Sequence, residues 1–253
     1  MHQKLRTVFF LTGMLLLAAR VCPAAGTIPF KPGEQLQYSI YWEDIAAGVV
    51  TFEVKPMAAV NGIPAYHFTM SSATSPFLSA ILMISDRVES YADIGMAHAL
   101  LYKERNSGTT AQDVTVTFDW KKQEAQYSFN GKKYRPSPLV PGAFDPLSVL
   151  YALRLLDLKG IQEISRPVSD GLACVVVRAK VPGKQKVRVE SGEYDAYVVE
   201  PQLAGFSKIF DMLSGATVKL WISADERRLP VKIMCGLPLG NFTAELKSSK
   251  AGN

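Results

Sequence analysis

The sequence contains few of the residues on which most catalytic and metal centres depend. It has three histidines and three cysteines among 253 residues. None of them falls in a His-Glu-x-x-His or Cys-x-x-Cys motif, and there is neither a Gly-x-Ser-x-Gly elbow nor a glycine-rich phosphate loop. Isolated histidines without carboxylates at motif spacing do not predict a zinc site. We therefore predict no metal, no cofactor and no catalytic residue.

The sequence also lacks a run of basic residues interleaved with aromatic residues, which is the usual pattern of a nucleic-acid-binding surface. The chain has 28 lysines and arginines against 23 aspartates and glutamates, a net charge of +5. Residues 1–25 hold three of the basic residues and no acidic one. The remaining chain has 25 basic and 23 acidic residues, a net charge of +2, and we expect no nucleic-acid partner.

An uncharged apolar run lies near the N-terminus, over residues 7–19, after a basic start. Its length of about 13 residues matches the apolar region of a signal peptide and is too short to cross a bilayer comfortably. Small residues follow at 24–26 as candidate cleavage positions. We predict that residues 1–25 are a cleaved signal peptide and that residues 26–253 form one domain in a bacterial periplasm, without a transmembrane span.

Other interpretations of this N-terminal segment stay open. The segment could remain in the membrane as an uncleaved anchor, or Cys22 could carry a lipid. Arg20 and Val21, directly before that cysteine, fit a lipoprotein cleavage site poorly. Cys174 and Cys235 remain after cleavage, and an oxidising compartment would allow a disulfide between them. Strand alternation does not obviously pair them, so two separate buried thiols are the alternative.

Alternating hydrophobicity and frequent turn signals predict a mainly β domain. Residues 35–42 alternate apolar and polar side chains, as expected of a half-buried strand. Asn61-Gly62 and Asn130-Gly131 predict tight hairpins, because both residue types tolerate positive φ. One main α-helix is expected at about 145–158, with Asp145 as N-cap and Pro146 as its first residue.

Two apolar segments, 75–84 and 203–216, fit neither pattern and are expected to be short helices or ordered loops. Large apolar side chains must be buried, which stabilises a protein by roughly 1.5–3 kcal/mol each. They could complete the core, form the wall or lid of a ligand cavity, or dock to a membrane or partner. The residues concerned are Phe77, Leu78, Ile81, Leu82, Phe206 and Phe210.

Short motifs spread over nearly the whole chain after residue 25 carry a family resemblance. In order they are Phe30–Glu34 before Tyr38–Trp42, Gly48, Asp86–Ser90, Asp145–Ser148 with Tyr151 and Arg154, and Trp221–Asp225 before Leu229–Val231. Together they resemble a bacterial family defined only as a domain of unknown function, DUF3108. The resemblance implies an exported envelope protein and assigns it no catalytic residue.

A looser similarity concerns residues 221–231, a strand, a charged turn and a Leu-Pro strand. This hairpin resembles one in periplasmic lipoprotein carriers, whose curved antiparallel sheets wrap as half-barrels around an apolar cavity lidded by helices. The similarity implies a strongly curved antiparallel sheet or half-open β-barrel, with one main helix and short helical segments. It also suggests that the two apolar segments, 75–84 and 203–216, act as lids or walls of that cavity.

From these features we expect a non-catalytic protein that binds a lipid, an acyl chain or another apolar envelope ligand in the curved sheet. Rival functions are envelope assembly or scaffolding through a protein partner, and a hydrolase without a recognisable motif. Arg87 and Arg154 are expected either to meet a polar head group or to form structural ion pairs with Asp86, Glu89 or Asp145. The candidate apolar ligand contacts are Trp42, Phe77, Leu78, Ile81, Leu82, Phe206, Phe210 and Trp221. For each tryptophan, a position in the core is the favoured alternative to ligand contact.

Overall fold

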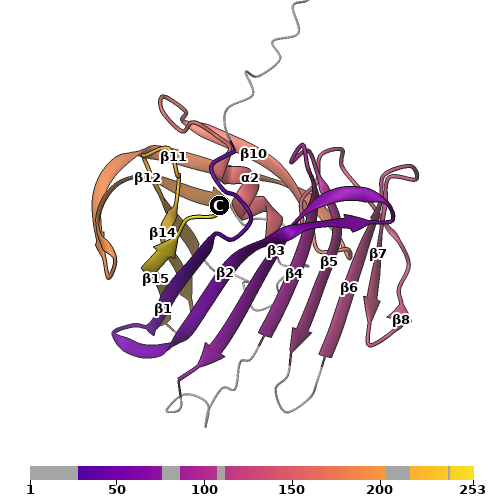
Figure 1. The fold of residues 1–253 in the computed structure, drawn as a ribbon, viewed down its shortest axis with the longest axis horizontal. Helices are drawn as coiled ribbons and strands as arrows, with labels where there is room; N and C mark the ends of the chain where they lie inside the picture. Colours follow the sequence, from indigo (N-terminus) through magenta and orange to yellow (C-terminus); the bar gives the residue numbers. More distant parts are fainter. Residues whose placement is uncertain (1–27, 76–85, 107–111, 203–216, 239) are drawn as a thin grey trace, which may run out of the picture.

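The computed structural model describes residues 28–75, 86–106, 112–202, 217–238 and 240–253 (Figure 1). In this part of the chain, fifteen strands form one sheet around one helix, α2 (Ser148–Arg154). The strands are β1 Gln35–Trp42, β2 Ile45–Val60, β3 Ile63–Thr74, β4 Asp86–Asp93, β5 Ala99–Asn106, β6 Gln112–Asp119, β7 Glu124–Phe129, β8 Lys132–Lys133, β9 Ser137–Pro138, β10 Glu163–Ser169, β11 Cys174–Val189, β12 Gly192–Gln202, β13 Thr217–Ser223, β14 Pro230–Leu237 and β15 Gly240–Lys250.

The sheet is antiparallel throughout and runs in the order β10 to β15, then β1 to β8, with β9 paired to β7. The first and last strands of the domain are therefore neighbours in the middle of the sheet, where β1 pairs with β15 along its whole length. Figure 1 shows the sheet curving around α2. The prediction of a mainly β, strongly curved antiparallel sheet is confirmed.

The two edges of the sheet do not pair with each other, so the sheet is not closed into a barrel. The segment 137–144 lies between them. At one end Ser137 pairs with Ala125 of β7, and at the other Phe144 forms a parallel bridge with Val168 of β10. Backbone hydrogen bonds of 3.0 and 2.8 Å connect Phe144 to β10. Residues 137–144 therefore connect β7 with β10 across the gap between the two edges of the sheet.

The predicted hairpin turns form where the Asn-Gly pairs lie. Asn61 and Gly62 have φ of 51° and 81°, and Asn130 and Gly131 have φ of 47° and 79°. Two consecutive positive φ values match the right-handed twist of the flanking strands, and asparagine and glycine reach them at low cost. At both turns, the Asn-Gly pair alone was therefore enough to predict the hairpin from the sequence.

The helix is shorter than the predicted span of 145–158 and starts at Ser148, two residues after the predicted first residue Pro146. Asp145 accepts hydrogen bonds of 2.9 Å from the backbone N–H groups of both Leu147 and Ser148, as an N-cap does. At the other end, Leu155 and Leu156 bond to residues three positions back, the tighter pattern of a final turn. The helix therefore ends at Arg154.

Packing of aromatic rings holds α2 in the concavity of the sheet. Tyr151 stacks on Phe68 of β3 with ring centroids 3.8 Å apart, and Phe30 packs edge-on against both rings. All three side chains belong to the main buried cluster. Because one face of α2 is anchored in this way, its other apolar residues face the space between the helix and the two halves of the sheet.

Candidate functional site

An apolar cavity of about 510 Å³ lies between α2 and the inner face of the sheet. This volume lies within the range of small-molecule sites, roughly 300–1,000 Å³. Residues of α2 form one wall and strands from both halves of the sheet form the others. The cavity is lined by Phe52, Met70, Val88, Tyr102, Glu104, Pro146, Leu147, Val149, Leu150, Leu153, Ile164, Arg166, Val168, Val177, Ala179, Val199, Pro201, Val218, Leu220 and Ile233.

Strand register explains why these residues share one face. In one half of the sheet, Phe52 pairs with Met70, and Met70 pairs with Val88, so three adjacent strands present one apolar row. In the other half, β12, β13 and β14 present a second row, made by Val199, Leu220 and Ile233. Side chains directly opposite each other on neighbouring strands point to the same face. Sheet curvature brings the two rows together around the cavity.

Polar groups in the lining are few. Tyr102 donates a hydrogen bond of 3.0 Å to the carboxylate of Glu104 on the same strand. Arg166 lies on β10, on the same face as Ile164 and Val168, which flank it at two-residue spacing and also line the cavity. An apolar cavity with a few placed polar groups is the usual form of a small-molecule site.

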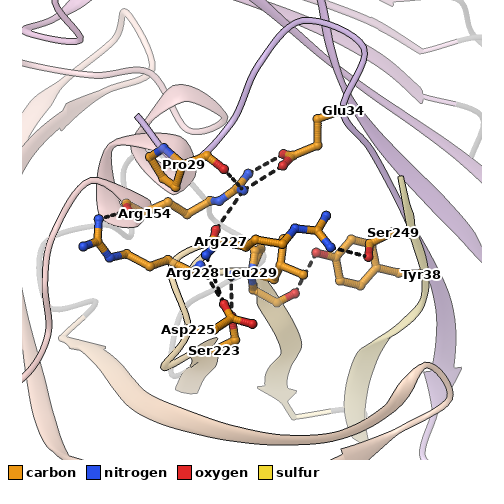
Figure 2. Close-up of polar contacts among 11 residues, drawn as sticks. Pro29, Glu34, Tyr38, Arg154, Ser223, Asp225, Arg227, Arg228, Leu229 and Ser249 are labelled. Atoms are coloured by element: carbon orange, nitrogen blue, oxygen red, sulfur yellow. Dashed lines mark hydrogen bonds and ion pairs between the residues drawn. The ribbon is translucent and has the colours of Figure 1, made fainter. Parts of the chain in front are cut away.

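A buried ion pair fixes the C-terminal end of α2. Arg154 Nη1 and Nη2 donate hydrogen bonds of 2.6 and 2.9 Å to the two carboxylate oxygens of Glu34. The exposed fractions of the two side chains are 0% and 3%. The guanidinium also donates to the carbonyl oxygens of Pro29 and Arg227, as Figure 2 shows. Of the two roles expected for Arg154, the geometry supports a structural ion pair and not contact with a polar head group.

The expected partners of Arg154 were nevertheless wrong. Its carboxylate partner is Glu34, whereas Asp145 caps the helix and Glu89 pairs with Arg87 at 3.2 Å. Because its guanidinium is buried and occupied, Arg154 does not face a ligand in this structure. Arg87, with 64% of its side chain exposed, lies in a surface pair.

The same network ties the turn between β13 and β14 to the helix (Figure 2). Asp225 accepts hydrogen bonds from the backbone N–H groups of Arg227 and Arg228 and from the hydroxyl of Ser223. Arg228 in turn donates to the carbonyl oxygens of Arg154 and Leu155. These contacts tie the C-terminal end of α2 to the turn between β13 and β14.

The two tryptophans expected to contact a ligand lie elsewhere. Trp42 stacks against Phe242 with ring centroids 6.3 Å apart. Trp221 is only 7% exposed and belongs to the main buried cluster, with the ammonium groups of Lys219 and Lys232 each 5.9 Å from its ring. Neither tryptophan lines the cavity, so the geometry of this cavity does not support the expected ligand contact.

Six predicted ligand contacts, namely Phe77, Leu78, Ile81, Leu82, Phe206 and Phe210, lie outside the described residues. Their role as wall or lid stays a prediction. Cys174 and Cys235 lie within the described residues, and both are free thiols. Cys174 accepts a hydrogen bond of 3.4 Å from the backbone N–H of Val140, and burial raises the pKa of both thiols. The alternative of two separate thiols is the one observed.

One cluster of titratable groups lies outside the cavity lining. Tyr91 donates a hydrogen bond of 2.9 Å to Glu89, and His67 stacks on the Tyr91 ring, with Nε2 3.5 Å from Glu89. Burial lowers the pKa of His67, while burial and the Glu89 hydrogen bond raise the pKa of Tyr91 to about 12. The described residues contain no group of three or more candidate metal ligands.

Sequence reasoning missed the residues that actually form the cavity. The pattern Ile164-x-Arg166-x-Val168 was a usable signal, because it places one charge on an otherwise apolar strand face. The rows on β2 to β4 and on β12 to β14 gave no such signal, since alternation predicts which residues share a face and not which face turns inward.

The comparison with family models decides the family. The model described as "Protein of unknown function (DUF3108)" matches residues 37–247, which include almost the whole sheet. The chain belongs to the DUF3108 family. A search of the curated proteins found no match. The described part of this DUF3108 chain contains no helix long and apolar enough to cross a membrane.

One solved structure shares the fold of this DUF3108 chain at low sequence identity, and two others are less similar. A β-barrel-like protein of domain of unknown function DUF1849 from Brucella abortus is 8% identical, with a TM-score of 0.55, over 88% of this chain and 99% of its own. A protein described as exported, with a YmcC-like fold, from Bacteroides fragilis is 8% identical with a TM-score of 0.37 over 89% and 99%. A protein described as a lipoprotein from Parabacteroides distasonis is 9% identical with a TM-score of 0.37 over 88% and 98%.

Proposed function

We propose that this DUF3108 protein binds an apolar or amphipathic envelope molecule, such as a lipid or acyl chain, in the cavity between α2 and the sheet, without catalysing its conversion. The observation that carries the proposal is the cavity itself, about 510 Å³ in volume and lined almost wholly by apolar side chains. Several lining side chains, including Val177, Leu220 and Ile233, are only partly buried. A bound apolar molecule would remove their exposed surface from water.

Energetics favour an apolar ligand over a polar one. Burying apolar surface stabilises a complex by roughly 25 cal/mol per Å², before the cost of immobilising the ligand. A polar ligand would lose hydrogen bonds to water, and the wall supplies few groups to replace them. The ligand class is therefore a molecule with a substantial hydrocarbon portion.

Export is the second part of the proposal, and the N-terminal pattern of residues 1–25 supports it. The full chain should be expressed in a Gram-negative bacterium and the periplasmic fraction analysed by N-terminal sequencing. A mature chain that starts close to residue 26 is expected. Retention of an intact N-terminus in the membrane fraction would contradict cleavage.

The binding proposal is tested first by extraction. The chain lacking residues 1–25 is purified without detergent, extracted with organic solvent and analysed by mass spectrometry, with an apolar fluorescent probe as an independent assay. Release of a defined lipid or acyl species at near-stoichiometric amounts is expected, as is probe fluorescence that an added fatty acid reverses. No released lipid together with no probe binding would overturn the proposal and favour a scaffolding role.

A matched pair of substitutions locates the binding. Val177 lines the cavity, whereas its neighbour Val176 is 53% exposed and lies outside the lining. Because successive residues of a strand point to opposite faces, Val177→Trp would fill the cavity and Val176→Trp would not. We expect at least a tenfold loss of probe affinity for Val177→Trp only. Equal affinities for the two variants would place the probe elsewhere.

A further inference from the structure

The cavity wall contains one basic residue, Arg166, that forms no ion pair with any carboxylate in the described part of the chain. Arg166 lies on β10 between Ile164 and Val168, and all three line the cavity. Its side chain is half-buried. A basic side chain in the middle of an apolar face loses hydration, and a partner of opposite charge normally compensates for that loss.

Among the described residues, Arg166 has no such partner. Its guanidinium donates one hydrogen bond, of 3.1 Å, to the carbonyl oxygen of the adjacent Ser165, and it forms no ion pair with a described carboxylate. The contrast with Arg154 is direct, because that arginine has both carboxylate oxygens of Glu34 within hydrogen-bonding distance. The guanidinium of Arg166 therefore retains donors for another molecule.

The acidic groups nearby are engaged in other contacts. Glu104, the other charged residue in the wall, accepts a hydrogen bond from Tyr102. Asp170, in the turn after β10, accepts hydrogen bonds of 2.9 Å from the backbone N–H groups of Leu172 and Ala173. No ion pair joins either carboxylate to Arg166 among the described residues, so these residues leave its guanidinium able to bind an incoming anion.

We infer that Arg166 binds the anionic head group, a carboxylate or phosphate, of an amphiphile whose hydrocarbon tail occupies the apolar cavity. The inference rests on the proposed function and makes it more specific. The planar guanidinium matches such oxyanions with two parallel hydrogen bonds, which are stronger than bonds between neutral groups. The half-buried position suits a head group at the cavity mouth, with the tail against Phe52, Leu220 and Ile233.

The test compares ligands of equal tail length. Dodecanoate, dodecyl phosphate and dodecanol are titrated by calorimetry into the chain lacking residues 1–25, below their aggregation concentrations, and inorganic phosphate alone serves as the anion without a tail. Because a hydrogen bond to a charged group corresponds to roughly a tenfold or greater gain in affinity, both anionic amphiphiles should bind at least about tenfold more tightly than dodecanol. Inorganic phosphate should bind far more weakly than dodecyl phosphate.

A matched pair of variants assigns the preference to one residue. Arg178 is exposed on β11 between the lining residues Val177 and Ala179, so its side chain points to the opposite face. Arg166→Gln should lose the preference for dodecanoate over dodecanol while keeping its affinity for dodecanol. Arg178→Gln removes the same charge from a neighbouring strand and should behave as the wild-type protein. Circular dichroism checks that both variants are folded.

The outcomes separate this inference from the function on which it rests. Equal affinities of the wild-type protein for dodecanoate and dodecanol would overturn the role of Arg166 and leave the apolar site intact. Failure of all three amphiphiles to bind would overturn the proposed function as well. Binding of inorganic phosphate as tight as that of dodecyl phosphate would indicate an anion site and not an amphiphile site. If Arg166→Gln does not fold, Arg166→Met, which suits an apolar wall, should lose the preference for dodecanoate over dodecanol, and an unchanged preference would count against the inference.

Discussion

Arg154 and Glu34 lie 120 residues apart in the chain and form a two-point ion pair in the interior, with Nη–Oε distances of 2.6 and 2.9 Å. The pair connects the segment before β1 to the end of α2. Because α2 forms one wall of the cavity, the pair also determines where that wall lies. Its energetic role can be tested directly.

Removal of one partner should destabilise the fold strongly. Glu34→Gln or Arg154→Met would leave a buried charge uncompensated, which costs about 3–5 kcal/mol. The double variant Glu34→Leu/Arg154→Met leaves no charge unpaired and should lose less than either single variant. Urea unfolding of all three measures these differences. Additive losses in the double variant would contradict the interpretation of a coupled buried pair.

The close approach of β2 and β3 at Gly48 should make this position intolerant of a side chain. A Cβ atom at Gly48 would lie 2.3 Å from the carbonyl oxygen of Ala73, a distance that real Cβ contacts do not adopt. Since backbone on a paired strand must shift, we expect Gly48→Ala to lower the free energy of unfolding by about 1–3 kcal/mol. Val49→Ala, at an exposed neighbouring position, is the control and should cost far less.

The N-cap of α2 should contribute measurably to stability. The Asp145 carboxylate is fully buried and accepts hydrogen bonds from the backbone of Leu147 and Ser148 and from the hydroxyl groups of Ser90 and Ser148. Asp145→Ala leaves these donors without an acceptor and should cost at least about 2 kcal/mol. Asp145→Asn keeps one carbonyl oxygen and should cost less. Thermal unfolding by circular dichroism distinguishes the two.

Protonation of His67 should oppose folding. Burial lowers the pKa of His67 in the folded state below its ordinary value of about 6.5. As the pH falls below 6.5, the unfolded chain takes up the proton first, so the free energy of unfolding decreases until the folded-state pKa is passed. NMR titration should give a midpoint below 6.5, and His67→Phe should lose less stability than the wild-type protein between pH 7 and pH 5. A midpoint above 6.5 would reverse the sign of this effect.

Cys174 and Cys235 should behave as two separate, slow-reacting thiols. Both are free and half-buried, and burial raises the pKa of each, which lowers the fraction of reactive thiolate. The chain lacking residues 1–25 should show two thiols with a colorimetric reagent in denaturant and much slower reaction when folded. Loss of both thiol signals in unreduced, denatured protein would instead show a disulfide.

Local features of the fold followed from the sequence. The Asn-Gly hairpins were predicted correctly, because each depends on interactions within a few residues. Asp145 does accept hydrogen bonds from the backbone next to α2, although the helix starts at Ser148 and not at the predicted Pro146. The partner of Arg154 was not predicted, because Glu34 approaches it only after β1 and α2 have packed. Trp42 and Trp221 were candidate ligand contacts with a core position as the alternative, and the sequence does not show which side chains line the cavity.

The sequence by itself therefore determined the β class, the turns, the presence of the helix and the family, because periodicity and short motifs are properties of neighbouring residues. Only the tertiary structure decided which strand face encloses the cavity, that Glu34 neutralises Arg154, and that Arg166 remains available in an apolar wall. The physical reason is that sheet curvature and long-range pairing depend on contacts between strands far apart in the chain.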